Sequence, residues 1–73
     1  MDAWNDGDRV IWRLYIAPGK TDHVPCIVRE VMLHRVKVEI ANIVDGETIR
    51  VTRLVAPKNL VSRTQHIPEV DGN

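Results

Sequence analysis

The stretch VKVEIANIVDGETIRVTRLV, residues 36–55, decides the fold of this chain. Two runs rich in β-branched residues flank the dipeptide Asp45-Gly46, which suits the positive φ angles of a two-residue type I′ turn. Such a turn places Val44 opposite Glu47 and thereby sets the pairing of every residue behind it. The stretch therefore predicts a β-hairpin of fixed register.

This register divides the hairpin into two faces, because directly opposed residues point to the same side of a sheet. We expect the inner face to carry Val36, Val38, Ile40, Ile49, Val51 and Val55. The outer face then carries Lys37, Glu39, Thr48, Arg50 and Thr52, together with Ala41, Ile43 and Leu54. Arg53 is the charged exception on the inner face, and we expect it near the rim with its head group in water.

Length and composition fit one small all-β domain. The chain has 73 residues, is 44% hydrophobic and contains no Phe, so that its apolar residues are mostly Val, Ile and Leu, which favour strands. A chain of this size buries only ~60% of its unfolded surface, so its core is small. No segment repeats apolar residues at the helical period over eleven or more positions, which argues against a long α-helix.

The rest of the chain predicts four further features around the hairpin. A first strand runs over 9–16, for which we choose Val10 and Trp12 as the inner residues although both faces are partly apolar. The segment 17–24 is dense in loop formers, and Pro25 opens a second strand. In that strand the expected inner residues are Cys26, Val28 and Val31. Their uneven spacing indicates a β-bulge near 29–30.

After the hairpin, the sequence predicts a 3₁₀ turn and a short last strand. Residues 56–60 place a proline before a polar pair and Leu60, and residues 61–63 form the closing strand. The expected organisation is a loose arm over 1–6, a small β-barrel over 7–63 and a disordered acidic tail over 64–73. Five short strands around an aliphatic core can close into a barrel without exposing long edges.

This layout resembles the Src-homology-3-like small barrels, including the Tudor-like, KOW-like and related bacterial barrels. The resemblance rests on short stretches at 7–10, 25–28, 35–38 and 55–60, and it covers most of the chain. It implies a five-stranded barrel with a 3₁₀ turn before the last strand. Members of this fold bind nucleic acids, read peptides or serve as subunits, so the fold alone does not assign a function.

The binding sites of those relatives can be compared with the aromatic residues of this chain, which are Trp4, Trp12 and Tyr15. A cage for a methylated cation draws aromatic residues from two loops, and the loop at 42–47 offers none. A groove for proline-rich peptides also needs an aromatic lining. The resemblance therefore implies neither kind of reader.

No arrangement of residues indicates catalysis, a cofactor or a metal site. Gly19-Lys20-Thr21 resembles the end of a phosphate-binding loop, but Leu14 stands where that motif requires glycine. Cys26 is the single cysteine, and one cysteine with three scattered histidines does not provide the ligands of a structural zinc site. We expect Cys26 to be a small core residue and the chain not to be an enzyme.

The single cysteine excludes an internal disulfide and suits a reducing compartment. No apolar run approaches the ~18 residues of a membrane span, and residues 1–15 lack the pattern of a secretory signal. The expected location is the cytoplasm, without membrane contact.

Charge is distributed unevenly along the chain, although the ten basic and ten acidic residues cancel overall. Residues 8–63 hold all ten cations against six acids, which leaves +4, and seven of the ten are arginines. The candidate binding surface comprises Arg9, Arg13, Tyr15, Arg29, Arg35, Lys37, Arg50, Ile43 and Leu54. Arginine binds phosphate and stacks on bases, so DNA or RNA is one expected partner.

Two alternatives account for the same surface. Apolar residues on the outer hairpin face, Ile43 and Leu54 among them, could bind a protein partner or a second copy of the chain. An ordinary mixed-charge surface would also explain the arginines, because acidic residues are interleaved with them. The chain is expected to be a binding module, with nucleic acid ahead of protein as its partner.

Overall fold

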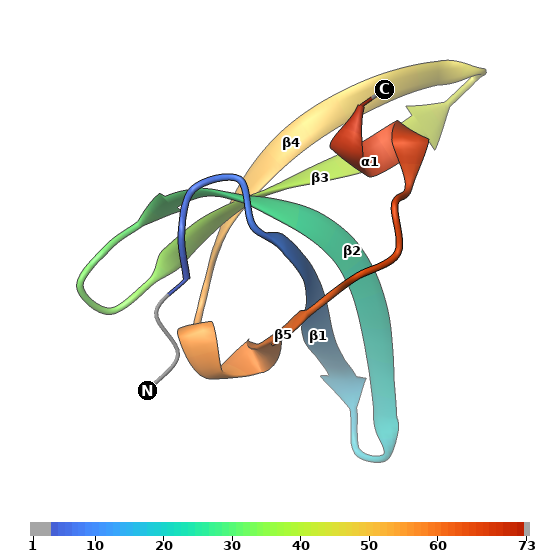
Figure 1. Cartoon of the computed structure of the whole chain (residues 1–73). Helices are drawn as coiled ribbons and strands as arrows, with labels where there is room; N and C mark the ends of the chain where they lie inside the picture. Colours follow the sequence, from blue (N-terminus) through green and yellow to red (C-terminus); the bar gives the residue numbers. More distant parts are fainter. Residues whose placement is uncertain (1–3, 73) are drawn as a thin grey trace.

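A five-stranded antiparallel sheet organises the chain in the computed structural model, which describes residues 4–72 (Figure 1). Its strands are β1 (Arg9–Ala17), β2 (Lys20–Val31), β3 (Val36–Val44), β4 (Glu47–Val55) and β5 (Leu60–Ser62). Their order across the sheet is β4-β3-β2-β1-β5. The 3₁₀ helix η1 (Pro57–Asn59) precedes β5, and the short helix α1 (Pro68–Asp71) follows it. The predicted all-β class and the 3₁₀ turn before the last strand are confirmed.

The β3–β4 hairpin has the register that its turn predicts. All nine residue pairs are as expected, from Val44 opposite Glu47 to Val36 opposite Val55. Asp45 and Gly46 have φ angles of 52° and 79°, the left-handed values that a type I′ turn requires at both central positions. Turn chemistry alone was sufficient here, because a two-residue turn leaves no freedom in the pairing.

The inner face of the sheet holds the hydrophobic core. Its buried members are Val10, Cys26, Val28, Val36, Val38, Ile40, Val55 and Leu60, with Trp4, Trp12, Val24 and Val51 packed against them. The choice of Val10 and Trp12 as the inner residues of β1 is confirmed. We use "inner face" for this side of the sheet and "outer face" for the other.

Ile49 is the exception among the predicted core residues of the hairpin, because its surface is 44% exposed. The β2–β3 pairing ends at Glu39, so the distal half of the β3–β4 hairpin extends past β2. The predicted inner-face position of Ile49 is confirmed by its pairing with Asn42, but its side chain is not buried, since the pattern gives the face of a residue and not the extent of the core beneath it. Arg53 is exposed as expected, and its Nη1 donates to the Thr52 carbonyl.

The segment 17–24 forms no long loop. β1 and β2 continue to a tight turn at Pro18-Gly19, where Gly19 has a φ of 76°. Pro25 consequently lies inside β2, opposite Ile11, and does not open the strand. The Val28 N–H donates to the Asp8 carbonyl and therefore points towards β1. Because backbone N–H directions alternate along a strand, the Pro25 nitrogen points the other way, towards the side of β2 on which β3 lies. The pairing with β3 ends at Ile27, so no strand lies beside Pro25 on that side. A proline is tolerated there because no ladder hydrogen bond is lost.

The predicted bulge in β2 is confirmed at Arg29. Val28 pairs with Val38 and Glu30 with Lys37, so Arg29 is the extra residue in the ladder. Cys26 and Val28 are fully buried as expected. Val31 is opposite Val36 and so has its predicted inner position, but it lies beyond the core, next to the connection to β3, and is exposed.

Residues 64–72 lie against the sheet and end in α1, whereas the sequence predicts a disordered tail (Figure 1). The helix contacts β2 and β3 on the outer face, where Val70 and Ile27 are both buried.

Within the expected loose arm, Trp4 packs on the core and its Nε1 donates to the Pro57 carbonyl over 3.4 Å. Residues 1–3 of that arm lie outside the described part of the chain. No helix over 4–72 has the length and apolarity needed to cross a membrane.

Candidate functional site

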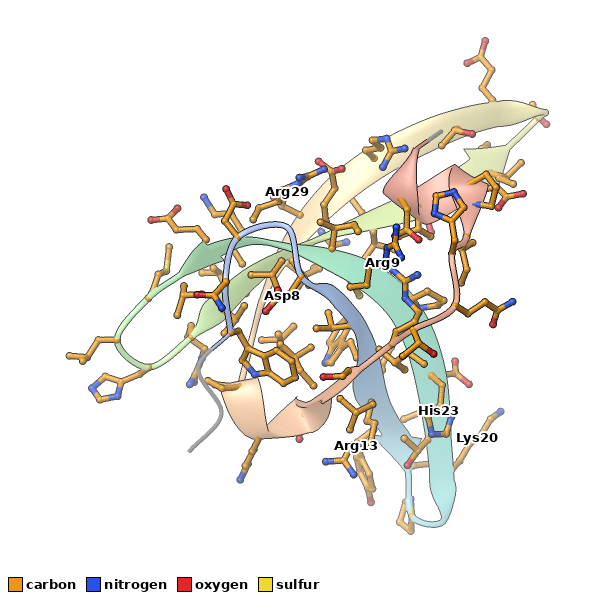
Figure 2. All side chains as sticks on the ribbon, in the orientation of Figure 1. Asp8, Arg9, Arg13, Lys20, His23 and Arg29 are labelled. Carbon is orange, nitrogen blue, oxygen red and sulfur yellow. The ribbon has the colours of Figure 1, made fainter. Side chains whose placement is uncertain are left out.

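The predicted cations are distributed over the sheet and do not form one cluster (Figure 2). Arg9 and Arg13 stand on β1, Arg29 at the bulge of β2, Lys37 on β3 and Arg50 on β4. All five side chains reach solvent. Their neighbours separate them into cations that pair with carboxylates and cations that do not.

Glu39 joins two of these arginines on the outer face. Its Oε2 lies 3.2 Å from Arg29 Nη2 and 3.1 Å from Arg50 Nη1. Partial burial raises the pKa of the Glu39 carboxyl, but the hydrogen bonds and charges of the two arginines outweigh it and leave the pKa below its usual value. Beside this cluster, Lys37 Nζ pairs with Glu30 at 3.4 Å. These three cations are already matched by acids of the same chain.

Arg63 is the residue that the sequence analysis did not single out. It follows β5 and lies buried on the outer face, with 7% of its surface exposed. Its Nε donates to the Val10 carbonyl, and its Nη2 donates to the Cys26 carbonyl over 3.0 Å. Its remaining N–H groups donate to the Gln65 carbonyl and to both carboxylate oxygens of Asp71. A charged residue at the end of a short strand gives no signal in the sequence that it will be buried.

Asp71 is the anion that balances Arg63. The hydrogen bonds from Arg63 hold the pKa of the Asp71 carboxyl far below its usual range, and the Ile67 N–H, donating over 2.8 Å, acts in the same direction. Arg9 Nε and His66 Nδ1 each lie 3.6 Å from Asp71 Oδ2. Arg9 is thereby the fourth of the predicted cations that pairs with a carboxylate.

Arg50 also ties α1 to the sheet. Its Nη1 donates to the Val70 carbonyl over 3.0 Å, and its Nη2 donates to the Glu69 carbonyl over 3.2 Å. Both carbonyls belong to the four-residue helix α1. Arg50 thus serves two elements of its own chain and is less available to an external ligand than its exposure suggests.

The outer face of the β1–β2 hairpin has a different character. Arg13 lies opposite His23, and Tyr15 lies opposite Thr21, so the four side chains share one face. Tyr15 is 66% exposed, and Lys20 stands at the adjoining turn (Figure 2). The Arg13 guanidinium donates to the Lys58 carbonyl over 2.8 Å, which draws Lys58 of η1 to the same margin.

No carboxylate within residues 4–72 lies within 4 Å of the side-chain nitrogens of Arg13, Lys20, His23 or Lys58. Asp22 is opposite Leu14 and therefore points to the other face, and Lys20, next to Thr21 in β2, points to that face as well. We call the surface of Arg13, Tyr15, Thr21, His23 and Lys58 the hairpin face. It combines an exposed aromatic ring with unpaired cations.

The remaining candidates lie apart from the hairpin face and from each other. Arg35 is exposed in the β2–β3 connection, and its Nη1 donates to the His34 carbonyl. Ile43 is exposed near the β3–β4 turn, whereas Leu54 lies beside Lys37 near the other end of that hairpin. Six residues of β3 separate the two positions, which is roughly 20 Å at 3.3 Å per residue. Ile43 and Leu54 therefore do not form one apolar patch.

Cys26 is fully buried, and its Sγ donates to the Val24 carbonyl over 3.1 Å. Burial raises the pKa of the Cys26 thiol to about 11, although a backbone hydrogen bond from Trp12 and the charge of Arg63 act against it. Among the described residues, no pocket is found and no group of His, Cys, Asp and Glu is placed to hold a metal ion.

Comparison of the chain with models of protein families, with curated proteins and with solved structures gives no match. The functional argument therefore rests on the surface itself. Its most distinctive part is the hairpin face, because the other predicted cations of the sheet are held by acids of their own chain.

Proposed function

We propose that this chain is a small, non-enzymatic binding module whose hairpin face contacts single-stranded DNA or RNA. The observation that supports this function is the exposure of Tyr15 beside Arg13 and His23, with no carboxylate of residues 4–72 paired to either of the two basic side chains. An aromatic platform flanked by cations is the combination that binds stacked bases and backbone phosphates.

Each residue of the hairpin face has a separate role in this proposal. Tyr15 offers its ring to a base, and Arg13 offers the guanidinium N–H groups that Lys58 does not use. Lys58 contacts a phosphate further along the strand. Because these contacts address backbone and base faces more than base edges, we expect little sequence preference.

The ion-paired cations contribute less in this view. A phosphate that approaches Arg29 or Arg50 competes with the Glu39 carboxylate, which lies 3.2 and 3.1 Å from them. The same holds for Lys37 with Glu30 and for Arg9 with Asp71. Affinity is therefore concentrated at the β1–β2 end of the sheet.

Fluorescence anisotropy with a labelled oligothymidine at low salt tests this proposal. Tyr15→Ala is expected to weaken binding by about 5- to 150-fold, as loss of one stacked base does. Arg13→Gln is expected to weaken binding and to reduce the salt slope by about one. The matched control is Arg29→Gln, which removes an arginine that is also exposed but is paired with Glu39.

Binding that is absent at low salt, or that Arg29→Gln weakens as much as Arg13→Gln does, would contradict the proposal. Binding that persists unchanged at high salt would also count against phosphate contact, because counterion release makes such binding salt-dependent.

We further propose that the sheet is closed as a Src-homology-3-like barrel. Support comes from the strand order, from the bulge at Arg29, and from η1 leading into β5, which pairs with β1. Trp4 adds a contact between the N-terminal segment and Pro57 at the same end. Nuclear Overhauser contacts between the C-terminal end of β4 and β5 in solution would support closure, and their absence would oppose it.

Contact with another protein is the second candidate function. Leu33, in the β2–β3 connection, is 90% exposed, and Met32 and Val31 before it are exposed as well. Exposed apolar residues in sequence favour a protein partner. A partner recovered with the wild type from its own cell extract, and lost with Leu33→Asp, would support this function, and equal recovery with both would oppose it.

The absence of catalysis and a reducing, cytoplasmic location complete the proposal. Cys26, the one cysteine, is buried and has a raised pKa, and a single cysteine forms no internal disulfide, which suits a reducing compartment. A buried thiol of this kind is a poor nucleophile and stays reduced without a partner.

A further inference from the structure

β4 forms a long edge of the sheet, and its protection against strand addition is limited to its charged side chains, including Arg53 on the inner face. It is nine residues long, contains no proline and pairs with β3 without a bulge. The opposite edge, β5, has only three residues, and the uncovered stretch of β2 carries Pro25. Long, regular edges without a proline or a bulge are the ones that accept another strand, and the charges of β4 do not oppose it where they meet opposite charges.

The turn at Asp45-Gly46 determines which backbone groups of β4 are free. In a two-residue hairpin the residues that flank the turn, here Val44 and Glu47, form a hydrogen-bonded pair. Odd-numbered residues of β4 therefore direct their N–H and C=O groups towards β3. The even-numbered residues direct theirs to the open edge, and they are Thr48, Arg50, Thr52 and Leu54.

We propose that β4 pairs antiparallel with β4 of a second copy of this chain, centred on Arg50. In this register Glu47 lies opposite Arg53 of the second copy, Thr48 opposite Thr52, and Ile49 opposite Val51. Each of these pairs occurs twice, because the two-fold axis passes between the two Arg50 residues. The even-numbered backbone groups face each other, as an antiparallel ladder requires.

Charge complementarity is the first argument for this register. Glu47 and Arg53 are exposed, lie on the same face of β4, and form no ion pair within the described residues 4–72. The proposed pairing gives both of them a partner. It also explains why an arginine stands on the inner face of the hairpin.

Apolar exposure is the second argument. Ile49 is exposed on the inner face, and Val51 beside it is half-buried. Pairing Ile49 with Val51 of the second copy, twice over, covers all four side chains. The second copy then provides packing neighbours for the tip of the β3–β4 hairpin, to which β2 does not extend.

Neighbouring registers are less favourable. Moving the centre to Val51 places Ile49 opposite Arg53 and Glu47 opposite Val55, so that both charges face apolar residues. The proposed register does place Arg50 opposite Arg50. That repulsion is reduced because each Arg50 is held by its own Glu39 and by the carbonyls of its own α1.

The association pairs the two copies over residues 47–53 and does not use the C-terminal end of β4, which barrel closure brings to β5. Both copies of α1 lie on the same face of the joined strands. Self-association through β4 does not use Arg13 or Tyr15 and therefore does not depend on nucleic-acid binding.

The test is a charge exchange followed by sedimentation equilibrium over a concentration series that extends into the millimolar range. The wild type is expected to reach twice the chain mass of 8.3 kDa. Glu47→Arg and Arg53→Glu should each raise the dimer dissociation constant roughly tenfold or more, because each sets like charges opposite each other twice. The double variant restores opposite charges and should restore the dimer.

Arg35→Glu is the matched control, because it makes the same charge change at an exposed arginine outside β4. It should leave the dissociation constant unchanged, and circular dichroism should show that every variant is folded. A wild type that remains monomeric throughout the series would overturn the proposal. Single variants that dimerise like the wild type, or a double variant no better than either single one, would overturn it as well.

Discussion

Arg63 and Asp71 form a buried ion pair that fixes the C-terminal segment to the outer face of the sheet. Two N–H groups of the Arg63 guanidinium donate to the two Asp71 oxygens over 2.8 and 2.7 Å, and only 2% and 3% of the side chains are exposed. Arg63 also donates to carbonyls of β1 and β2, so the pair connects α1 with both strands. A bidentate pair of this kind positions its partners more closely than a lysine could.

Asp71→Ala should lower the free energy of unfolding by about 3 kcal/mol, because it leaves the Arg63 charge buried without a counter-ion. This decrease in the free energy of unfolding should be at the lower end of the range for buried ion pairs, because release of α1 would let water reach the Arg63 guanidinium. Urea unfolding followed by circular dichroism measures the change. Glu69→Ala, at an exposed acid of the same helix, is the control and should cost less than about 0.5 kcal/mol. Equal stability of the two variants would contradict the role of the pair.

Acid should destabilise the protein through the same residue. The pKa of the Asp71 carboxyl is lower in the folded chain than in the unfolded chain, so the folded state binds fewer protons. Its contribution is complete above the unfolded pKa of about 3.9 and decreases as the pH falls towards the folded value. Glu39 acts in the same direction.

The effect of acid on stability can be tested by measuring the urea midpoint of unfolding from neutral pH down to about pH 3. The midpoint should begin to fall at roughly pH 5. Asp71→Asn cannot take up the proton, so its stability should start lower and fall less steeply over that interval. A wild-type midpoint that stays constant to the lowest pH, or equal slopes for the two proteins, would show that Asp71 does not carry the effect.

Local chemistry explains which parts of the fold the sequence predicts. Asp45-Gly46 selects one turn, and that turn specifies nine residue pairs without further information. The uneven spacing of Cys26, Val28 and Val31 likewise reveals the bulge at Arg29. The sequence predicts a loop over 17–24, where the structure has the end of a β-hairpin. A polar hairpin and a polar loop have the same composition, and only the pairing of β1 with β2 distinguishes them.

The surface was harder to predict than the strands. The sequence indicates that Arg9, Arg29 and Arg50 face outwards, but their pairing with Asp71 and Glu39 depends on contacts between distant segments. Burial of Arg63 depends on α1, whose four residues are too few to show a helical period. The hairpin face can therefore be recognised only in the structure, after the cations that pair with carboxylates have been identified and set aside.

The different burial of Val38 and Ile49 gives a direct test of where the core ends. Both residues belong to the inner face by register, but Val38 is fully buried and Ile49 is 44% exposed. Val38→Ala should lower the free energy of unfolding by about 2 kcal/mol, since it removes buried methyl groups and leaves a cavity. Ile49→Ala, compared at a concentration at which the chain is monomeric, should cost less than about 1 kcal/mol. Similar losses would mean that the core extends to the hairpin tip.

The Cys26 thiol should be unreactive as long as the chain is folded. Burial removes it from solvent and raises its pKa to about 11, so that at pH 8 the thiolate is more than about two-hundredfold scarcer than for a free cysteine with a pKa near 8.5. A disulfide reagent added in excess at pH 8 should therefore label the native protein far more slowly than the same protein in concentrated urea. The urea sample is the control for reagent and thiol content. Rapid labelling without denaturant would mean that β1 and β2 separate readily around Cys26, because only opening of that pairing exposes the sulfur.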